Sequence, residues 1–376
     1  MVFSLEPWDG VWRRNQYLVD GLLRADDSLR VLFIEPGRDV VNDALNGRRP
    51  RTGAGLRTVP GYDARLTLFQ PTKWMPRVAG PFADGMLRAG VRRAMRRTGV
   101  RQPVLWINDP NWASLVEPSG APALYDMTDD WIAAERPHRE HDRLVANERR
   151  LLERCAAVVV CSSALLQSRR GARPDAVLVP NAVDVARYRT PADRPADASR
   201  RRYAVYVGTL HEDRLDVDLV VDCGRRLAQF GAEVLLVGPD ALTAANSRRL
   251  RTAPGVSLLG AREYLAVPAY LQHAHTLIVP HVVTAFTDSL DPIKLYEYLA
   301  VGRPIVSTPV AGFRDFDGRG GVEIVAAPAF ADRLADAMAR PVTDMAPTEV
   351  PDWSVRVGQM AAVIDAMSHI AQSHSR

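Results

Sequence analysis

A lysine and a glutamate lie three residues apart in the stretch D-P-I-K-L-Y-E-Y-L-A, residues 291–300. Asp291 is a good N-cap residue and Pro292 a good first helical residue, so we expect a helix to begin here. Lys294 and Glu297 then lie on one side of its start. A helix start beside a lysine suits a pyrophosphate group, because both present positive charge and N–H donors. A carboxylate one turn deeper can accept hydrogen bonds from hydroxyl groups.

Lys294 also stands out by composition. Of the 48 lysine and arginine residues, only Lys73 and Lys294 are lysines. Such a bias is typical of GC-rich coding sequences, which replace lysine wherever arginine will serve. One retained lysine does not by itself establish a functional site. The alternative to a binding role is that Lys294 and Glu297 form an ordinary surface ion pair.

The elements around this stretch alternate between short apolar runs and helical segments, which is typical of parallel sheets covered on both faces. We expect strands in the first half at 30–35, 103–108, 123–127, 156–162 and 176–180. A second series is expected at 203–208, 233–238, 256–260, 275–280, 304–308 and 322–326. Helices are expected at 12–23, 138–154 and 353–367. The fold class is therefore α/β.

A chain of 376 residues favours two domains. We predict a first Rossmann-like domain over 1–183, a polar, Pro-containing linker over 184–202 and a second Rossmann-like domain over 203–352. The helix at 353–372 is expected to complete the first domain.

Several function classes lack their signatures. The chain has no G-x-G-x-x-G, no G-x-x-x-x-G-K-[ST] and no G-x-S-x-G, which weakens dehydrogenase, ATPase and serine hydrolase hypotheses. The D-x-D patterns at 216–218 and 315–317 are short, and we interpret the first as carboxylates on a helix surface. The three cysteines have no C-x-x-C spacing, and no apolar run is long enough to span a membrane, so we expect a reduced, cytoplasmic protein.

Net charge is +4, and a basic segment at 86–101 has six arginines and no acid. As a helix it would place Leu87, Val91, Ala94 and Met95 on one face and arginines on the other. It could rest on an anionic membrane surface, or be a solvated surface helix whose apolar face points to the core. Nothing indicates nucleic-acid binding.

The ordered motifs of the second half are Y-V-G-T-L-H-E-D-R (206–214), L-L-G-A-R-E-Y (258–264), L-I-V-P (277–280) and D-P-I-K-L-Y-E-Y-L-A-V-G-R-P-I-V-S-T (291–308). Together they resemble the donor-binding half of GT-B glycosyltransferases, especially glycosyltransferase family 4. Motifs of the first half include W-R-R-N-Q-Y-L (12–18), L-Y-D-M-T-D-D-W (124–131) and V-P-N-A-V-D (179–184). They look like the acceptor half of bacterial transferases that make surface polysaccharides and related glycosides.

The resemblance implies two Rossmann-like domains that face each other across a cleft and a terminal helix that crosses back to the first domain. It implies that Glu297 binds the donor ribose, that Arg214 and Lys294 stabilise the departing nucleoside diphosphate, and that Gly208 lets the backbone approach the phosphates. The further donor-side residues that it implies are Gly10, Thr209, Arg262, Ser289 and Leu290.

Two positions depart from the family pattern. Thr209 stands where many relatives have arginine, and Ser289, beside Asp288, stands where an E-x7-E motif needs its first acid. The contact that this acid makes with the donor sugar is therefore in doubt.

On the acceptor side, Asp9, which could orient a sugar hydroxyl or stabilise a turn, is a third catalytic candidate beside Arg214 and Lys294. The acceptor candidates follow strand ends, where open α/β sheets bind ligands: Asn108, Asp109, Asp126 and Asp130. The alternative for Asp126 and Asp130 is capping of the next helix.

The sequence thus predicts a hexosyltransferase-type glycosyltransferase, retaining and independent of metal or other cofactors. Its partners would be a UDP- or GDP-sugar donor and a sugar, lipid-linked or small-molecule acceptor, with peripheral contact to an anionic membrane through 86–101. The alternatives are a GT-B-fold nucleotide-sugar epimerase or hydrolase and a non-catalytic nucleotide-sugar-binding subunit.

Overall fold

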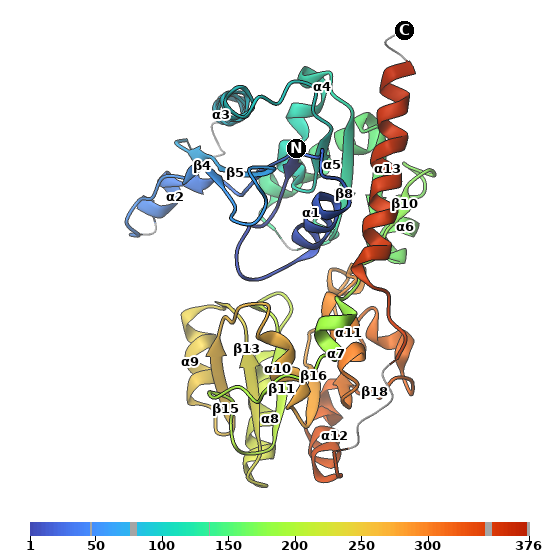
Figure 1. The fold of residues 1–376 in the computed structure, drawn as a ribbon. Coiled ribbons are helices and arrows are strands. Elements are labelled where there is room, and N and C mark those ends of the chain that lie inside the picture. Colours follow the sequence, from blue (N-terminus) through green and yellow to red (C-terminus); the bar gives the residue numbers. More distant parts are fainter. Residues whose placement is uncertain (46, 76–80, 135, 343–347, 374–376) are drawn as a thin grey trace. The chain divides into compact units, whose positions relative to one another are not determined.

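The computed structural model describes residues 1–45, 47–75, 81–134, 136–342 and 348–373. The chain forms two compact units (Figure 1). The first unit comprises Met1–Asp9, Arg14–Pro180 and Ser354–Arg376, and the second comprises Gly10–Arg13 and Asn181–Trp353. The terminal helix therefore belongs to the first unit.

The first unit is built on an eight-stranded sheet with the order β10-β9-β8-β7-β1-β2-β5-β4. All neighbouring pairs are parallel except β4 and β5. The strands are β1 (Val2–Phe3), β2 (Val31–Ile34), β4 (Gly55–Thr58), β5 (Leu66–Gln70), β7 (Leu105–Ile107), β8 (Ala123–Met127), β9 (Ala157–Val160) and β10 (Val177–Leu178). A small separate pair joins β3 (Arg38–Asp39) to β6 (Thr72–Lys73).

Helices surround this sheet. They are α1 (Arg14–Ala25), α2 (Val40–Leu45), α3 (Pro81–Thr98), the 3-10 helix η2 (Pro110–Leu115), α4 (Val116–Ser119), α5 (His138–Arg154), α6 (Ser163–Arg169) and α13 (Trp353–Ser373). α13 packs closely on α1, because a Cβ added at Gly21 would lie 2.3 Å from Cγ2 of Val357. A side chain at Gly21 would therefore clash with Val357 of the terminal helix.

The second unit has a parallel six-stranded sheet with the order β15-β13-β11-β16-β17-β18. Its strands are β11 (Tyr203–Val207), β13 (Glu233–Val237), β15 (Val256–Gly260), β16 (Thr276–Val279), β17 (Ile305–Ser307) and β18 (Val322–Ile324), with the short pair β12 (Leu210–His211) and β14 (Asp240–Ala241). The helices are α7 (Val185–Arg189), α8 (Val217–Ala228), α9 (Ala244–Thr252), α10 (Val267–Gln272), η3 (Thr287–Ser289), α11 (Ile293–Val301), η4 (Phe313–Phe316) and α12 (Ala327–Ala339).

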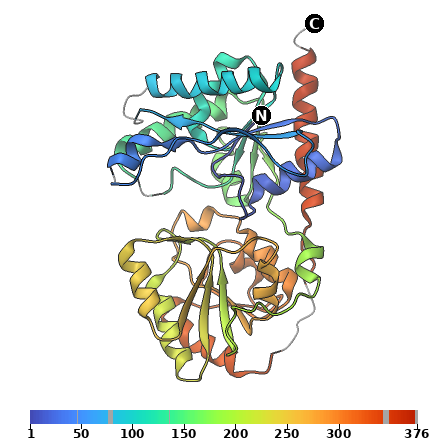
Figure 2. The same cartoon turned by 60° about the vertical axis from the view of Figure 1, so that its left-hand side comes forward.

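Both faces of this second sheet are buried under helices (Figure 2). Along β11, Ala204 and Tyr206 pack with α8 and α12, whereas Tyr203 and Val205 pack with α10 and α11. Because side chains alternate between the two faces of a strand, strands buried on both faces consist of near-continuous apolar residues. This explains why apolar runs predicted these strands.

The predicted fold class is confirmed, and each predicted strand is present within a few residues of its expected bounds. The apolar-run pattern missed β1, β4 and β5, which are very short or lie near the edge of the sheet. The residues expected to form a linker, 184–202, belong to the second unit. They include α7, and Tyr188 and Ala198 are buried in the core of the second unit.

The basic helix α3 begins at Pro81 and ends at Thr98. Val91 and Ala94 are buried in the core of the first unit, as the periodicity predicted. Arg92, Arg93 and Arg96 are exposed. The packing therefore fits a surface helix whose apolar face covers the sheet.

Candidate functional site

The helix with the Lys294–Glu297 pair, α11, begins one residue later than its sequence indicated. Pro292 occupies the N-cap position, where it provides no side-chain cap hydrogen bond. Asp291 is not the cap, because its carboxylate accepts hydrogen bonds from the Tyr296 hydroxyl (2.7 Å) and the Asn181 backbone N–H (2.5 Å). The helix ends at Gly302, whose φ of 73° is left-handed, as expected for a helix C-terminus.

Three side chains meet at the start of α11. The Lys294 ammonium donates to the Tyr206 hydroxyl at 2.8 Å and lies 3.3 Å from Nε2 of His281. The Tyr206 hydroxyl oxygen lies 3.0 Å from the same Nε2 of His281. The ammonium also lies 4.1 Å from the centre of the Tyr206 ring, within range of a cation–π interaction. Tyr206 comes from β11 and His281 follows β16, so two neighbouring strands hold the lysine in place.

The electrostatics of this cluster set the charge of Lys294. Burial, with the nearby positive charge of Arg214, lowers the pKa of Lys294 to about 7, while Glu297 opposes the change. Burial also lowers the pKa of His281 well below its ordinary value. His281 is therefore neutral at pH 7, and Lys294 gains or loses its proton near physiological pH.

Gly208 lies directly against this ammonium. Its φ of 147° is one that L side chains rarely adopt, and an added Cβ would lie 3.1 Å from Nζ of Lys294. The neighbouring turn also contains a glycine with positive φ, Gly238. A Cβ added there would lie 2.0 Å from the Gly208 carbonyl oxygen. Two glycine turns at the carboxyl ends of β11 and β13 thus leave the backbone open beside Lys294.

Glu297 lies one turn deeper in α11. The Tyr188 hydroxyl of α7 donates to Oε1 of Glu297 at 2.5 Å. Burial raises the pKa of Glu297, and the hydrogen bond from Tyr188 and the charge of Lys294 partly offset that rise. The carboxylate is therefore oriented before any ligand binds.

Arg214 is half-buried in the loop after β12. Its guanidinium lies 5.2 Å from the centre of the Phe286 ring, and its backbone carbonyl accepts from the Val282 N–H at 2.8 Å. Its charge lowers the pKa values of both His281 and Lys294, so the three groups share one electrostatic environment. The structure thus brings together Gly208, Arg214, Lys294 and Glu297.

The two positions that depart from the family pattern, Thr209 and Ser289, make local backbone contacts. The Ser289 hydroxyl donates to the Phe286 carbonyl at 2.8 Å inside η3. The neighbouring Asp288 accepts from Arg314 with both oxygens at 3.1 Å. Thr209 lies in the turn after Gly208, and its carbonyl is 3.5 Å from the Tyr206 hydroxyl. Leu290, the C-cap of η3, leads the chain into α11.

Arg262 lies in a hydrogen-bond network within the second unit. Its guanidinium donates to Asp197, to the Tyr270 hydroxyl and to the carbonyl oxygens of Leu259 and Ala261. This network ties the loop after β15 to the segment before β11. Its predicted contact with the donor stays a prediction.

The acceptor-side candidates of the first unit are mostly held in internal networks. Asp126 has no exposed surface and pairs with Arg14 at 3.1 Å, while the Trp106 indole N–H donates to it at 3.1 Å. The Asn108 amide donates to the Asp126 carbonyl at 2.9 Å. Asp126 is therefore held in the interior of the first unit and caps no helix, and its contact with the acceptor stays a prediction.

Of the other two acidic candidates, Asp130 is half-buried and Asp109 is buried. Asp130 pairs with Arg169 at 2.7 Å, and Arg169 also pairs with Glu148. Asp109 is the N-cap of η2 and accepts from the Asn111 backbone N–H at 2.9 Å.

Asp9 and Gly10 fall on opposite sides of the division between the two units. Asp9 is exposed, and its backbone carbonyl accepts from the Gln16 amide at 3.1 Å. The catalytic role of Asp9 and the donor contact of Gly10 stay predictions.

Sequence reasoning missed Tyr188, Tyr206 and His281. Tyr188 and Tyr206 lie in apolar stretches that favour a core position, and His281 follows the strand motif L-I-V-P without a pattern of its own. The one available sequence signal was the position of Tyr206, an aromatic residue two positions before Gly208.

No group of three or more His, Cys, Asp or Glu side chains in the described part of the chain could hold a metal ion. Asp216 of the D-V-D pattern caps α8 by accepting from the Leu219 N–H at 2.9 Å, and Asp218 pairs with Arg249 on the surface. No helix within the described ranges is both long and apolar enough to cross a membrane.

Comparison with known proteins finds a family to which most of the second unit is similar. Residues 201–344 match the family model described as Glycosyl transferases group 1. The chain is 25% identical over 203 residues to a Bacillus subtilis (strain 168) protein assigned as a teichuronic acid biosynthesis glycosyltransferase, TuaH. That match covers 49% of this chain and 50% of TuaH, so the chain spans about half the length of this curated relative.

Solved structures match over nearly the whole chain. Sucrose-phosphate synthase from Thermosynechococcus elongatus has a TM-score of 0.64 at 17% identity, covering 99% of this chain and 98% of that chain. A UDP-forming α,α-trehalose-phosphate synthase from Burkholderia vietnamiensis has a TM-score of 0.61 at 14% identity, covering 99% of each chain. Anabaena HepE in complex with UDP has a TM-score of 0.56 at 15% identity, covering 100% of this chain and 99% of that chain.

The protein therefore has the GT-B fold of glycosyltransferases, as the motifs predicted. Over residues 201–344 its second unit is similar to the group 1 glycosyl transferases.

Proposed function

We propose that this protein is a glycosyltransferase of family 4 type that moves a hexosyl group from a nucleoside-diphosphate sugar to an acceptor hydroxyl. The observation that carries the proposal is the cluster at the start of α11. A helix N-terminus without a side-chain cap, a lysine ammonium and an open glycine turn meet at one point of the second unit. Helix N–H groups and a cation together form a receptor for a diphosphate.

Each residue of the cluster has a role in this proposal. The diphosphate binds against Gly208 and the start of α11, and Glu297 accepts hydrogen bonds from the ribose hydroxyls. Lys294 and Arg214 stabilise the negative charge that develops on the leaving diphosphate. In a retaining mechanism of this kind the leaving phosphate helps to remove the proton from the acceptor hydroxyl, so the reaction needs neither a protein nucleophile nor a metal.

UDP is the first donor nucleotide to test. Among the similar structures, the Burkholderia vietnamiensis synthase is UDP-forming and Anabaena HepE is in complex with UDP. Teichuronic acid synthesis by TuaH suggests a bacterial surface polysaccharide as the acceptor, with a soluble glycoside as the other choice.

In this proposal the exposed arginines of α3 hold the protein at an anionic cytoplasmic membrane face. Flotation with neutral and anionic vesicles tests that contact, and equal recovery from both would refute it.

UDP should raise the melting temperature of the protein more than GDP or dTDP does, because a ligand held only by the folded state stabilises it. Glu297→Ala should weaken UDP binding and raise the donor KM by about 10- to 100-fold, the size expected for hydrogen bonds to one charged group. Thermal shift and initial-rate kinetics with a UDP-sugar measure both effects. Asp332→Ala, which removes an exposed acid of α12, is the matched control. No stabilisation by any nucleotide would overturn the proposed function.

UDP binding should also take up a proton at Lys294. Because the pKa of Lys294 is lowered to about 7, the side chain is a cation at pH 6 and mostly neutral at pH 8. A bound diphosphate favours the cation, so binding at pH 8 should take up about one proton, and UDP affinity should fall as the pH rises from 6 to 8. Calorimetry in two buffers of different ionisation enthalpy measures the uptake. Lys294→Met should bind UDP more weakly and without uptake, whereas uptake that persists in this variant would contradict the assignment.

A non-catalytic nucleotide-sugar-binding subunit is the second candidate, and Ser289 is the observation that favours it. The position expected to carry an acid has a hydroxyl that donates to the Phe286 carbonyl, and the adjacent Asp288 is paired with Arg314. Nucleotide binding without turnover on any acceptor would support this candidate. Consumption of the donor at full rate without acceptor would indicate an epimerase or hydrolase instead.

A further inference from the structure

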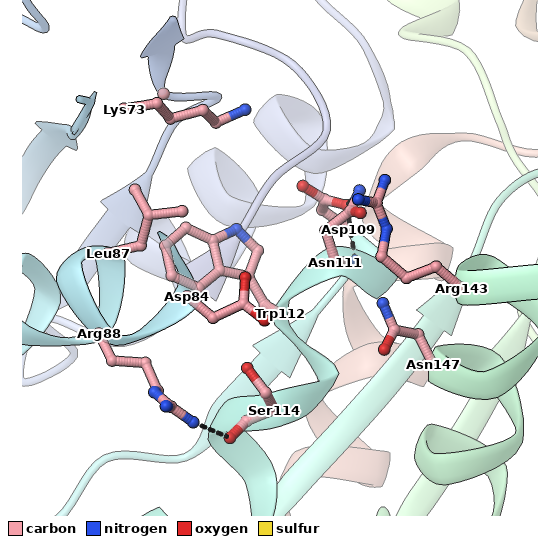
Figure 3. A pocket seen from close by; sticks show the side chains of 11 residues that line it. Lys73, Asp84, Leu87, Arg88, Asp109, Asn111, Trp112, Ser114, Arg143 and Asn147 are labelled. Atoms are coloured by element: carbon pink, nitrogen blue, oxygen red, sulfur yellow. Dashed lines mark hydrogen bonds between the residues drawn. The ribbon is translucent and has the colours of Figure 1, made fainter. Parts of the chain in front are cut away.

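A pocket in the first unit contains the other lysine of the chain, Lys73 (Figure 3). Its volume is about 80 Å³. One water needs only about 15 Å³, so the pocket is larger than a hydration site. Pockets that enclose a whole small-molecule ligand measure about 300 Å³ or more. This pocket therefore has room for one substituent of a ligand.

The pocket lies where an open α/β sheet binds its ligands. Gly37 follows β2, Lys73 follows β5 and Asp109 follows β7. These strands and β1 are parallel neighbours in the order β7-β1-β2-β5, so their carboxyl ends meet at one edge. The chain order reverses at β1, since the next strands along the chain lie on both of its sides. Ligands of such sheets bind at the carboxyl ends beside this reversal.

Three cationic side chains from separate elements line the pocket. They are Lys73 of β6, Arg88 of α3 and Arg143 of α5, and all three are half-buried. The absence of a side chain at Gly37 makes room for the lysine, because an added Cβ would lie 3.1 Å from Cε of Lys73. Arg88 is oriented by a hydrogen bond to the Ser114 carbonyl at 3.3 Å. Half-buried cations attract an anion more strongly than fully solvated ones do.

The remaining lining favours a sugar over a bare anion. Asp84 and Asp109 also line the pocket, so three cations and two carboxylates leave one net positive charge. One oxygen of Asp109 is occupied by the Asn111 backbone and side-chain N–H groups at 2.9 and 2.7 Å. The amide of Asn147 and the ring of Trp112 complete the wall. Acids and amides around an aromatic ring suit a hydroxylated ring, and the excess cation suits an acidic substituent.

We infer that this pocket is an acceptor subsite that takes a sugar bearing a carboxylate or a phosphate, with the anionic group among Lys73, Arg88 and Arg143. This inference rests on the proposed glycosyl transfer and adds the chemical class of the acceptor to it. A charge-assisted hydrogen bond from a guanidinium or ammonium is about twice as strong as a neutral one, so the acidic sugar is preferred over its neutral parent.

Binding to the full chain, measured by calorimetry without any donor, tests the inference directly. The probes are glucose, glucuronate and glucose 6-phosphate, with the same three forms of galactose as a second series. We expect the acidic form in at least one series to bind at least tenfold more tightly than its neutral parent. A preference for the uronic acid identifies a carboxylate as the bound group, and a preference for the 6-phosphate identifies a phosphate.

Variants of the pocket show whether these cations cause the preference. Lys73→Gln and Arg143→Gln should each reduce the affinity for the acidic sugar about tenfold and leave that for the neutral sugar unchanged. Arg92→Gln, which changes an exposed arginine of the same helix α3, is the matched control and should change neither. Melting temperatures of the unliganded variants show whether they fold.

Equal affinity for acidic and neutral sugars in both series would overturn the inference. It would also fall if the preference for the acidic sugar survived in the Lys73→Gln/Arg143→Gln double variant. Stabilisation by UDP is measured separately in the same proteins. If UDP binds and a sugar is transferred while the pocket variants behave as wild type, only the acceptor subsite is wrong. If no nucleotide binds, the proposed function fails, whatever the pocket does.

Discussion

Arg214→Ala should lower kcat/KM for the donor by about 30- to 1,000-fold, which corresponds to ~2–4 kcal/mol of lost transition-state stabilisation. Charge develops on the diphosphate oxygens as the bond to the sugar breaks, so a cation near them contributes more in the transition state than in the ground state. The loss should therefore appear mainly in kcat, with a smaller change in UDP affinity.

The structure suggests why Arg214 cannot be replaced by its neighbours. The pKa of Lys294 is near neutrality, so at pH 8 Arg214 is the cation of the cluster whose charge is permanent. The charge of Arg214 also lowers the pKa of Lys294, so Arg214→Ala should raise that pKa and keep Lys294 charged at higher pH. The defect of the variant relative to wild type should therefore become smaller as the pH rises from 6 to 8. Initial-rate kinetics across this range measure it, with Arg225→Ala on the exposed side of α8 as control. A variant with wild-type kcat/KM at every pH would remove Arg214 from the site.

Asp126→Leu should lower the free energy of unfolding by about 3–5 kcal/mol, because it removes the carboxylate that pairs with the buried guanidinium of Arg14. Arg14 is 4% exposed and Asp126 is not exposed at all, so water cannot replace the lost contact. The Trp106 indole N–H also loses its acceptor. Urea denaturation followed by circular dichroism measures the change.

A second variant separates the ion pair from simple packing. Replacing both partners, as Arg14→Met with Asp126→Leu, should recover much of the stability, because no unpaired buried charge remains. Asp142→Ala, at an exposed position of α5, serves as the control and should change the unfolding free energy by less than about 0.5 kcal/mol. Equal stability of Asp126→Leu and wild type would show that Asp126 is no structural residue.

Much of the fold was predictable because local patterns and tertiary structure agree. Strands such as β11 and β13 are buried on both faces, so they read as continuous apolar runs. Helix α5 has the bounds that its sequence predicted, His138–Arg154. Of the strands that were missed, β5 and β4 lie at one edge of their sheet, and the two-residue β1 is held in the middle by its pairing with β2 and β7 rather than by its own length.

The candidate site was predictable only in part. Lys294, Glu297, Gly208 and Arg214 were visible as spacings within short motifs. The partners that tune them were not, because Tyr206 lies 88 positions from Lys294 and Tyr188 lies 109 positions from Glu297. Spacing within a helix carries no information about such contacts. The start of α11 was misplaced by one residue for the same reason, since Asn181 draws the Asp291 carboxylate away from the cap position.

By itself, the sequence determined the α/β class, the order of the strands along the chain and the presence of two unusual lysines. Apolar periodicity and residue spacing are properties of neighbouring residues, and they survive in the linear chain. Only the tertiary structure decided that Lys294 lies between Tyr206 and His281 with a pKa near 7, and that Asp126 is a buried partner of Arg14. Burial and charge act through space, so the ionisation and role of a side chain depend on residues that only folding brings next to it.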